Sequence, residues 1–88
     1  MPLWVRTLLL TAKPDEVEAC VEGHLDHLRG LAAEGRIRAA GELAGGDGYL
    51  EIFEAADRLE AERIARSSPL VEEGMGTWML REWRELQF

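Results

Sequence analysis

The residues of this sequence best suited to chemistry lie in two short stretches, His24 to His27 and the corner Ser67-Ser68-Pro69. An imidazole gains or loses its proton near neutral pH, so His24 is a candidate general acid or base, or a group that grips a ligand. A buried imidazole without a partner would cost roughly 1–3 kcal/mol, so a hydrogen-bond partner is expected. Ser68 or Ser67 is the natural one. We predict His24 and Ser68 as the catalytic candidates; the alternative is a core histidine with its hydrogen bonds satisfied.

Three further residues are candidates for ligand binding: Ser67, Arg38 and Trp78. A serine hydroxyl can hold a ligand oxygen, and an arginine inside a strand can grip an anion. Arg38 fits equally a solvated edge charge or an ion pair between subunits. The aromatics Trp4, Trp78 and Trp83 fit a dimer core better than a cofactor stack.

A metal site and a cofactor site are not predicted. His24-x-x-His27 has no evident third ligand, so His27 is expected at the surface. Cys20 lies on an apolar helix face without basic neighbours in sequence, which is typical of a buried thiol and not of a nucleophile. The run Gly45-Gly46-Asp47-Gly48 predicts a hairpin turn. No helix or Lys-Ser/Thr follows it, so it does not match a phosphate loop.

Size and charge narrow the class of protein. The 88 residues make one domain, 1–88, which would be marginally stable alone. One cysteine cannot form an intrachain disulfide. The net charge of −7 argues against a nucleic-acid or anionic-membrane partner. No apolar run is long enough for a membrane span and no leader is evident, so a cytoplasmic protein is expected.

The elements that would position these residues are predicted from the periodicity of apolar residues and from the positions of proline, glycine and helix-capping residues. Pro14-Asp15-Glu16 opens a helix and Gly35 ends it, with His24 near the middle of its apolar face. Asp57 and Glu60 form a capping box for a second helix, which Ser68-Pro69 ends. The expected elements are strand 3–11, helix 14–34, strand 36–43, strand 49–54, helix 58–67, loop 70–76 and strand 77–86.

The order βαββαβ predicts an α+β, ferredoxin-like fold, a four-stranded antiparallel sheet with both helices on one face. The strand 36–43 is expected to place four side chains on one of its sides, namely Ile37, Ala39, Gly41 and Leu43. The first and last strands are apolar on both sides, which is unusual for a sheet with one buried face. The uncovered face is therefore expected to meet a second copy of the chain, giving a homodimer.

Nearly the whole chain, from about Leu3 to Trp83, resembles the YCII-related protein family. The resemblance is carried by His24-Leu25-x-x-Leu28-x-x-Leu31-x-x-Glu34-Gly35-Arg36-Ile37, then Ala40-Gly41, then Ser68-Pro69-Leu70-Val71-x-x-Gly74. It implies a dimeric α/β barrel and a pocket between sheet and helices, where a helix histidine sits near an Asp just before a proline. His24 matches that histidine, and Ser68 stands at the Asp position. The loop between the middle strands also looks short.

Two functions remain open from the sequence. The first is a small-molecule enzyme of isomerase, lyase or hydrolase type in which His24 moves a proton. The second is a dimeric module that binds a small ligand or a protein without catalysis, favoured by Ser68 in place of the family's Asp. Haem or flavin binding has no support in the sequence.

Overall fold

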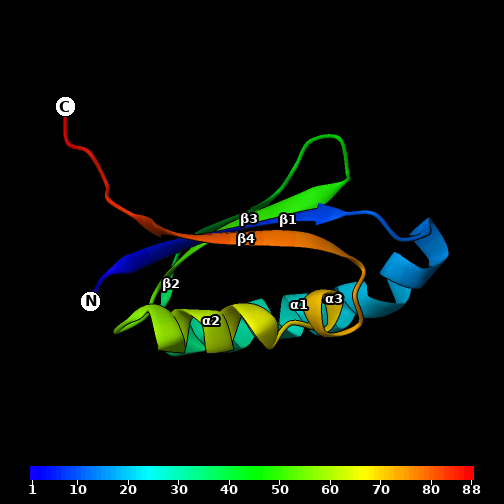
Figure 1. Ribbon diagram of the computed structural model, residues 1–88, viewed down its shortest axis with the longest axis horizontal. Coiled ribbons are helices and arrows are strands. Elements are labelled where there is room, and N and C mark those ends of the chain that lie inside the picture. Colours follow the sequence, from blue (N-terminus) through cyan, green and yellow to red (C-terminus); the bar gives the residue numbers. More distant parts are fainter.

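The computed structural model describes all 88 residues, and its elements follow the predicted order with one addition. Figure 1 shows a sheet above a layer of helices. The elements are β1 (Leu3–Leu10), α1 (Pro14–Ala33), β2 (Ile37–Glu42), β3 (Gly48–Glu54), α2 (Arg58–Arg66), α3 (Pro69–Glu72) and β4 (Gly76–Trp83). No helix is both long enough and apolar enough to cross a membrane.

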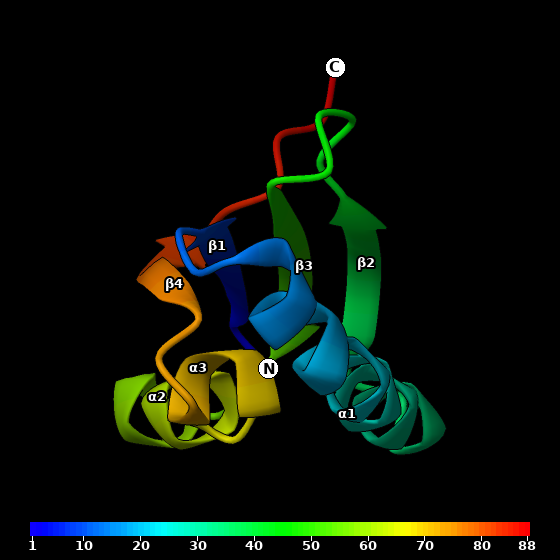
Figure 2. The same ribbon diagram turned by 90° about the vertical axis from the view of Figure 1, so that its right-hand side faces the viewer.

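The sheet is antiparallel throughout, with strand order β2-β3-β1-β4. Figure 2 shows α1 and α2 side by side beneath one face, with no element on the other. This is the predicted ferredoxin-like arrangement. Because the first and third strands lie at the centre, residues of β1 and β3 face the helices from the middle of the sheet.

One helix was not predicted. The segment after Ser68, expected to be a loop, begins with the short helix α3. Ser68 caps it, because its Oγ accepts a hydrogen bond from the Leu70 backbone N–H, and Pro69 occupies the first turn, where its missing N–H costs nothing. A four-residue helix has too little periodicity to be detected in a sequence. The last strand also ends earlier than expected, at Trp83.

The core lies between the sheet and the helices. Trp4, Phe53 and Leu80 pack there against Ala61 and Ala65 of α2. Trp4 is 5 % exposed, and its indole N–H donates to the Ala55 carbonyl. The expectation that all three tryptophans form a dimer core is therefore wrong for Trp4.

Trp78 also lies on the helix side of the sheet, because it is paired directly with Leu8 of β1. Directly paired residues in an antiparallel sheet point to the same face. Trp83 is paired with Leu3 and faces the uncovered side, where it is 40 % exposed. Of the three tryptophans, one lies where a dimer core was expected.

A bulge in β2 changes which residues face the helices. The register shifts between Ile37 and Ala39, so that Ile37 is paired with Phe53 and Ala39 with Ile52. Ile37 packs against the core, while Ala39 and Gly41 take the opposite face. The prediction that all of these residues share one side is wrong for Ile37, because Arg38 is an extra residue in the strand; Ala39 and Gly41 share one side as predicted.

The uncovered face of the sheet is apolar. Leu9 and Met79, both on this face, are 46 % and 57 % exposed. Half-buried apolar residues surround them, namely Leu3, Val5, Leu50 and Ile52. An apolar surface of this kind on a single chain commonly marks an interaction site.

Candidate functional site

His24 lies inside the molecule, on the face of α1 that is turned to the sheet, and it is 0 % exposed. Its Nδ1 is 2.6 Å from Ser68 Oγ, which is the contact predicted from the sequence. Its Nε2 is 3.1 Å from Glu51 Oε2. An ionised carboxylate only accepts, so Nε2 carries the proton and donates to Glu51. In the neutral imidazole Nδ1 then accepts from the Ser68 hydroxyl, whose oxygen also accepts from the Leu70 N–H.

The second carboxylate oxygen of Glu51 is held by an arginine. Arg6 Nε donates to Glu51 Oε1 over 2.8 Å, and Arg6 Nη1 donates to the Ala65 carbonyl over 2.7 Å. Both side chains are 0 % exposed. The result is a buried chain of contacts that runs from Arg6 through Glu51 and His24 to Ser68. Such a chain is costly to desolvate and holds the imidazole in one tautomer and one orientation.

Neither Glu51 nor Arg6 was predicted from the sequence as a residue of the site. The sequence nevertheless contains a pattern that indicates both residues. Arg6 alternates with Trp4 and Leu8, and Glu51 alternates with Tyr49 and Phe53. The period of two puts both charges on the buried face, and they are direct neighbours in the β1–β3 register. A charge on a buried strand face requires a partner, and here each is the partner of the other.

The buried chain of contacts shifts the pKa values of two side chains, Glu51 and His27. Burial alone would raise the pKa of Glu51, but the hydrogen bond from His24 and the charge of Arg6 outweigh burial and lower it. The pKa of His27 falls to about 4, chiefly because of burial and then because of Arg6 and His24. The Nε2 of His27 is buried without a hydrogen-bond partner. The predicted surface position of His27 is therefore wrong.

A close approach of α1 and α3 brings His24 to Ser68. A Cβ added to Gly23 would lie 2.7 Å from Pro69 Cγ. Each of these two residues is the chain neighbour of one member of the hydrogen-bonded pair. The missing side chain at Gly23 therefore lets α3 sit against α1 at the distance that the His24–Ser68 contact needs.

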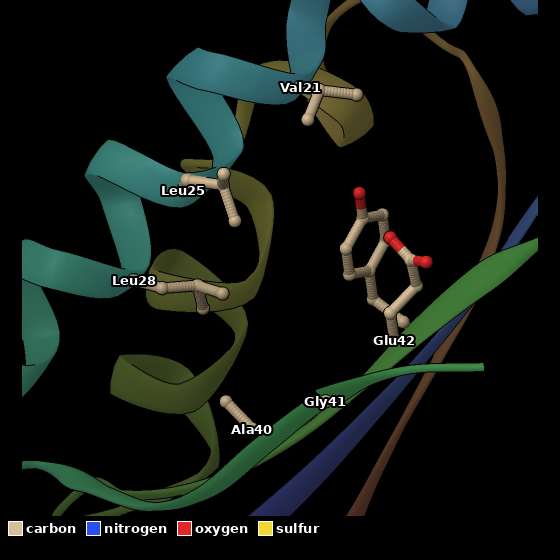
Figure 3. Close-up of a pocket in the computed structure, with 7 residues that line it drawn as sticks. Val21, Leu25, Leu28, Ala40, Gly41 and Glu42 are labelled. Carbon is tan, nitrogen blue, oxygen red and sulfur yellow. The ribbon is translucent and has the colours of Figure 1, made fainter. Parts of the chain in front are cut away.

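A cavity lies between α1 and the outer strand β2. Its volume is about 350 Å³, within the lower part of the range for small-molecule sites. Figure 3 shows Val21, Leu25 and Leu28 of α1 across the cavity from Ala40, Gly41 and Glu42 of β2. The seventh lining residue is Tyr49 of β3, whose ring centroid is 4.6 Å from that of His24. Tyr49 thus separates the cavity from the buried imidazole.

The other predicted ligand-binding residues do not gather at this cavity. Ser67 is exposed, and its hydroxyl donates to the Arg63 carbonyl. Arg38 forms an exposed ion pair with Glu85 at the β2 bulge. Trp78 lies near α3, and the Arg66 guanidinium carbon stands over its indole ring, 5.6 Å from the centroid of that ring. The structure assembles His24 with Ser68 and leaves these three elsewhere.

No three His, Cys, Asp or Glu side chains are grouped as metal ligands would be. Cys20, expected to be a buried thiol, is half-buried and packs against the cluster of Leu8, Tyr49 and Leu70.

Comparison with known proteins places the chain in a family. A model of the YCII-related domain matches residues 6–85. The chain belongs to the YCII-related family. It is 31 % identical over 78 residues to the uncharacterized protein YjpA of Bacillus subtilis (strain 168), a match that covers 88 % of this chain and 92 % of YjpA.

A solved structure has the same YCII fold. It is the 5-chloro-2-hydroxyhydroquinone dehydrochlorinase TftG from Burkholderia phenoliruptrix AC1100, in complex with 2,5-dihydroxybenzoquinone. The two chains superpose with a TM-score of 0.74 over 93 % of each, at 19 % identity. At that identity the likeness establishes the fold alone.

The YCII resemblance implied an acid at the position of Ser68, and its absence suggested that the imidazole lacks a carboxylate. The structure corrects that inference. Glu51, from β3, contacts the other ring nitrogen of His24. The hydroxyl and the carboxylate therefore hold opposite edges of one imidazole.

Proposed function

We propose that this YCII-related protein is a small-molecule enzyme in which His24 transfers a proton on a ligand bound between α1 and the sheet. One observation carries the proposal: both nitrogens of a buried imidazole are held by polar side chains, Ser68 at 2.6 Å and Glu51 at 3.1 Å. Glu51 would stabilise the imidazolium formed when His24 accepts a proton, and Arg6 keeps Glu51 ionised. The dehydrochlorinase name of the structural neighbour favours small-molecule chemistry on this fold.

The geometry sets a condition on this mechanism. His24 is closed off from solvent, and Tyr49 stands between it and the cavity. Both ring nitrogens of His24 are already hydrogen-bonded, so the Tyr49 side chain must rotate away and the proton must reach Nδ1 through the Ser68 hydroxyl, which passes its own proton to Nδ1 as it takes one from the ligand. Movements that open an enclosed site are a common gating step in enzymes.

A second candidate is a non-catalytic protein that binds a small ligand in the same cavity. The complete burial of His24 and Ser68 favours it, because packing and capping alone would also use these contacts. In this case His24 links α1 to β3 and α3, and Tyr49 remains a fixed wall of the cavity.

A screen of small organic substrates separates the two candidates. We expect turnover that falls by about 100-fold or more in His24→Gln, the range that general acid–base catalysis contributes. Glu51→Gln keeps the shape of the side chain and removes its charge, so it should lower the rate in the same direction. Asp26→Asn, on the exposed side of the same helix, is the matched control. Undiminished turnover in a folded His24→Gln protein would overturn the enzymatic proposal.

We further propose that the protein acts as a homodimer in the cytoplasm. The exposed apolar face of the sheet supports self-association, because the helices cover only the other face. The single cysteine, which has no partner within the chain, is in keeping with a reducing compartment.

A further inference from the structure

The cavity between α1 and β2 carries information about the charge of its ligand. Five of its seven lining residues are hydrophobic, and no lysine or arginine lines it. An engineered apolar cavity of about 150 Å³ can hold benzene. A volume of about 350 Å³ therefore has room for one substituted ring.

The polar side chains of the cavity stand together at one place in its wall. Glu42 and Tyr49 are direct cross-strand partners in the β2–β3 register, so both point toward the helices. Burial, and then the neighbouring Glu42 carboxylate, raise the pKa of Tyr49, so its hydroxyl stays protonated at neutral pH. The cavity therefore presents a carboxylate that only accepts hydrogen bonds, beside a hydroxyl that can donate or accept.

No cation in the lining of the cavity offsets this negative charge. Arg6 is already paired with Glu51. The protein as a whole carries a net charge of −7. Glu42 is exposed, so solvent screens its charge in part, but an organic anion entering the cavity would still meet this carboxylate and no lining cation, which is unfavourable.

We infer that this cavity selects a small ring compound, neutral or cationic, whose hydroxyl or amine donates a hydrogen bond to Glu42, and that it rejects organic anions. The inference rests on the proposed function in that the same cavity holds the substrate of His24. It names the charge class of that substrate, and it assigns its selection to Glu42 with Tyr49.

The test uses three probes of one ring size: benzylamine, benzyl alcohol and benzoate, each titrated into the whole protein at neutral pH and followed by amide NMR shifts. Probes this small are expected to bind with a Kd of about 1 mM. We expect benzylamine to bind at least about tenfold more tightly than benzoate, with benzyl alcohol between them. The shifts should map to the lining of the cavity, for example Val21, Gly41 and Tyr49.

Variants identify the selecting residue. Glu42→Gln should reduce the ratio of benzylamine to benzoate affinity at least about fivefold, because the charge is lost and the shape kept. Glu82→Gln, an exposed carboxylate on the opposite edge strand β4, should leave the ratio unchanged. Tyr49→Phe should weaken the alcohol more than the amine.

Several results would overturn the inference: benzoate binding as tightly as benzylamine, no change of the ratio in Glu42→Gln, shifts that map outside the cavity, or no binding of any probe. Its failure is separable from that of the proposed function. Probe selectivity without any turnover would refute the enzyme and keep the inference, whereas His24-dependent turnover of organic acids would do the reverse.

Discussion

His27 gives the molecule a specific weakness toward acid. Its imidazole Nε2 is buried without a hydrogen-bond partner, and the positive charge of Arg6 is close enough to lower its pKa. A proton on His27 would thus be unfavourable in the folded state. In the unfolded chain the same residue accepts a proton near its ordinary pKa of 6.5.

We expect the free energy of unfolding to fall as the pH drops from about 6.5 to 4. In that window the unfolded chain binds a proton that the folded chain resists, so acid favours unfolding. Because His27 is only half-buried, solvent screening reduces the loss to about 1–2 kcal/mol at the lower end. Urea unfolding at a series of pH values measures it, and His27→Asn should flatten the dependence. Glu51, whose pKa is lowered in the folded state, adds a further loss only below about pH 4.5. If the free energy of unfolding depends on pH with the same slope in the wild type and in His27→Asn, the assignment to His27 is contradicted.

Residue types alone indicated only part of the site. The His24–Ser68 contact was one of two predicted, with Ser67 as the alternative, because an imidazole on an apolar stripe requires a partner and the YCII resemblance puts the position of Ser68 beside that histidine. Glu51 was not predicted, although its alternation with Tyr49 and Phe53 places its side chain on the buried face of β3. The resemblance implied a pocket between the sheet and the helices, but the cavity is lined by neither His24 nor Ser68. Its position depends on the spacing of α1 from β2, which no sequence pattern reports.

At the scale of elements, the contact of α1 with α3 decides whether the site exists. Gly23 and Pro69 touch at the point where the two helices come closest, one residue away from His24 and Ser68. Alanine normally stabilises a helix relative to glycine by about 1 kcal/mol. At Gly23 this gain is opposed by a clash with a proline ring.

We expect Gly23→Ala to destabilise the protein by about 1–3 kcal/mol and to lengthen or break the His24–Ser68 hydrogen bond, because α3 must move away. Gly30→Ala in the same helix is the matched control, since nothing lies within 4 Å of its added Cβ. That variant should gain up to about 1 kcal/mol. Thermal unfolding compares the two, and the amide shift of Leu70 reports on the Ser68 cap. Equal stabilisation by both substitutions would show that α1 and α3 are not in close contact at Gly23.

The order of the elements was predictable where the sequence is strongly periodic or capped, as in α1 with Pro14 and α2 with Asp57. It failed where structure is short or irregular. The four residues of α3 carry no periodic signal, and the bulge at Arg38 inverts the faces of Ile37 and Ala39 without any change in composition.

At the scale of the whole molecule, one face of the sheet has no cover. Leu9 and Met79 lie there with substantial exposure, on the side of β1 and β4 that points away from the helices. An 88-residue chain buries a modest share of its surface, so a second copy against this face would complete the core.

We expect a dimer in solution whose interface is this face. Met79→Glu places an unpaired charge in the interface, so it should weaken the dimer at least about 100-fold. Leu59→Glu, at a residue 79 % exposed on α2, should leave the dimer intact. Size-exclusion chromatography with light scattering distinguishes the two states. A wild-type protein that is monomeric at high concentration, or a dimer lost only in Leu59→Glu, would contradict this arrangement.

The bulge in β2 also bears on how such a protein can fail. β2 is an outer strand with a free edge, and free edges recruit strands from other chains into aggregates that grow without limit. The extra residue, Arg38, interrupts the hydrogen-bond ladder and carries a charged guanidinium. The strand β2 is therefore a poor template for such pairing. We expect association not at the edge of the sheet but at its face, where a two-fold arrangement stops at two copies.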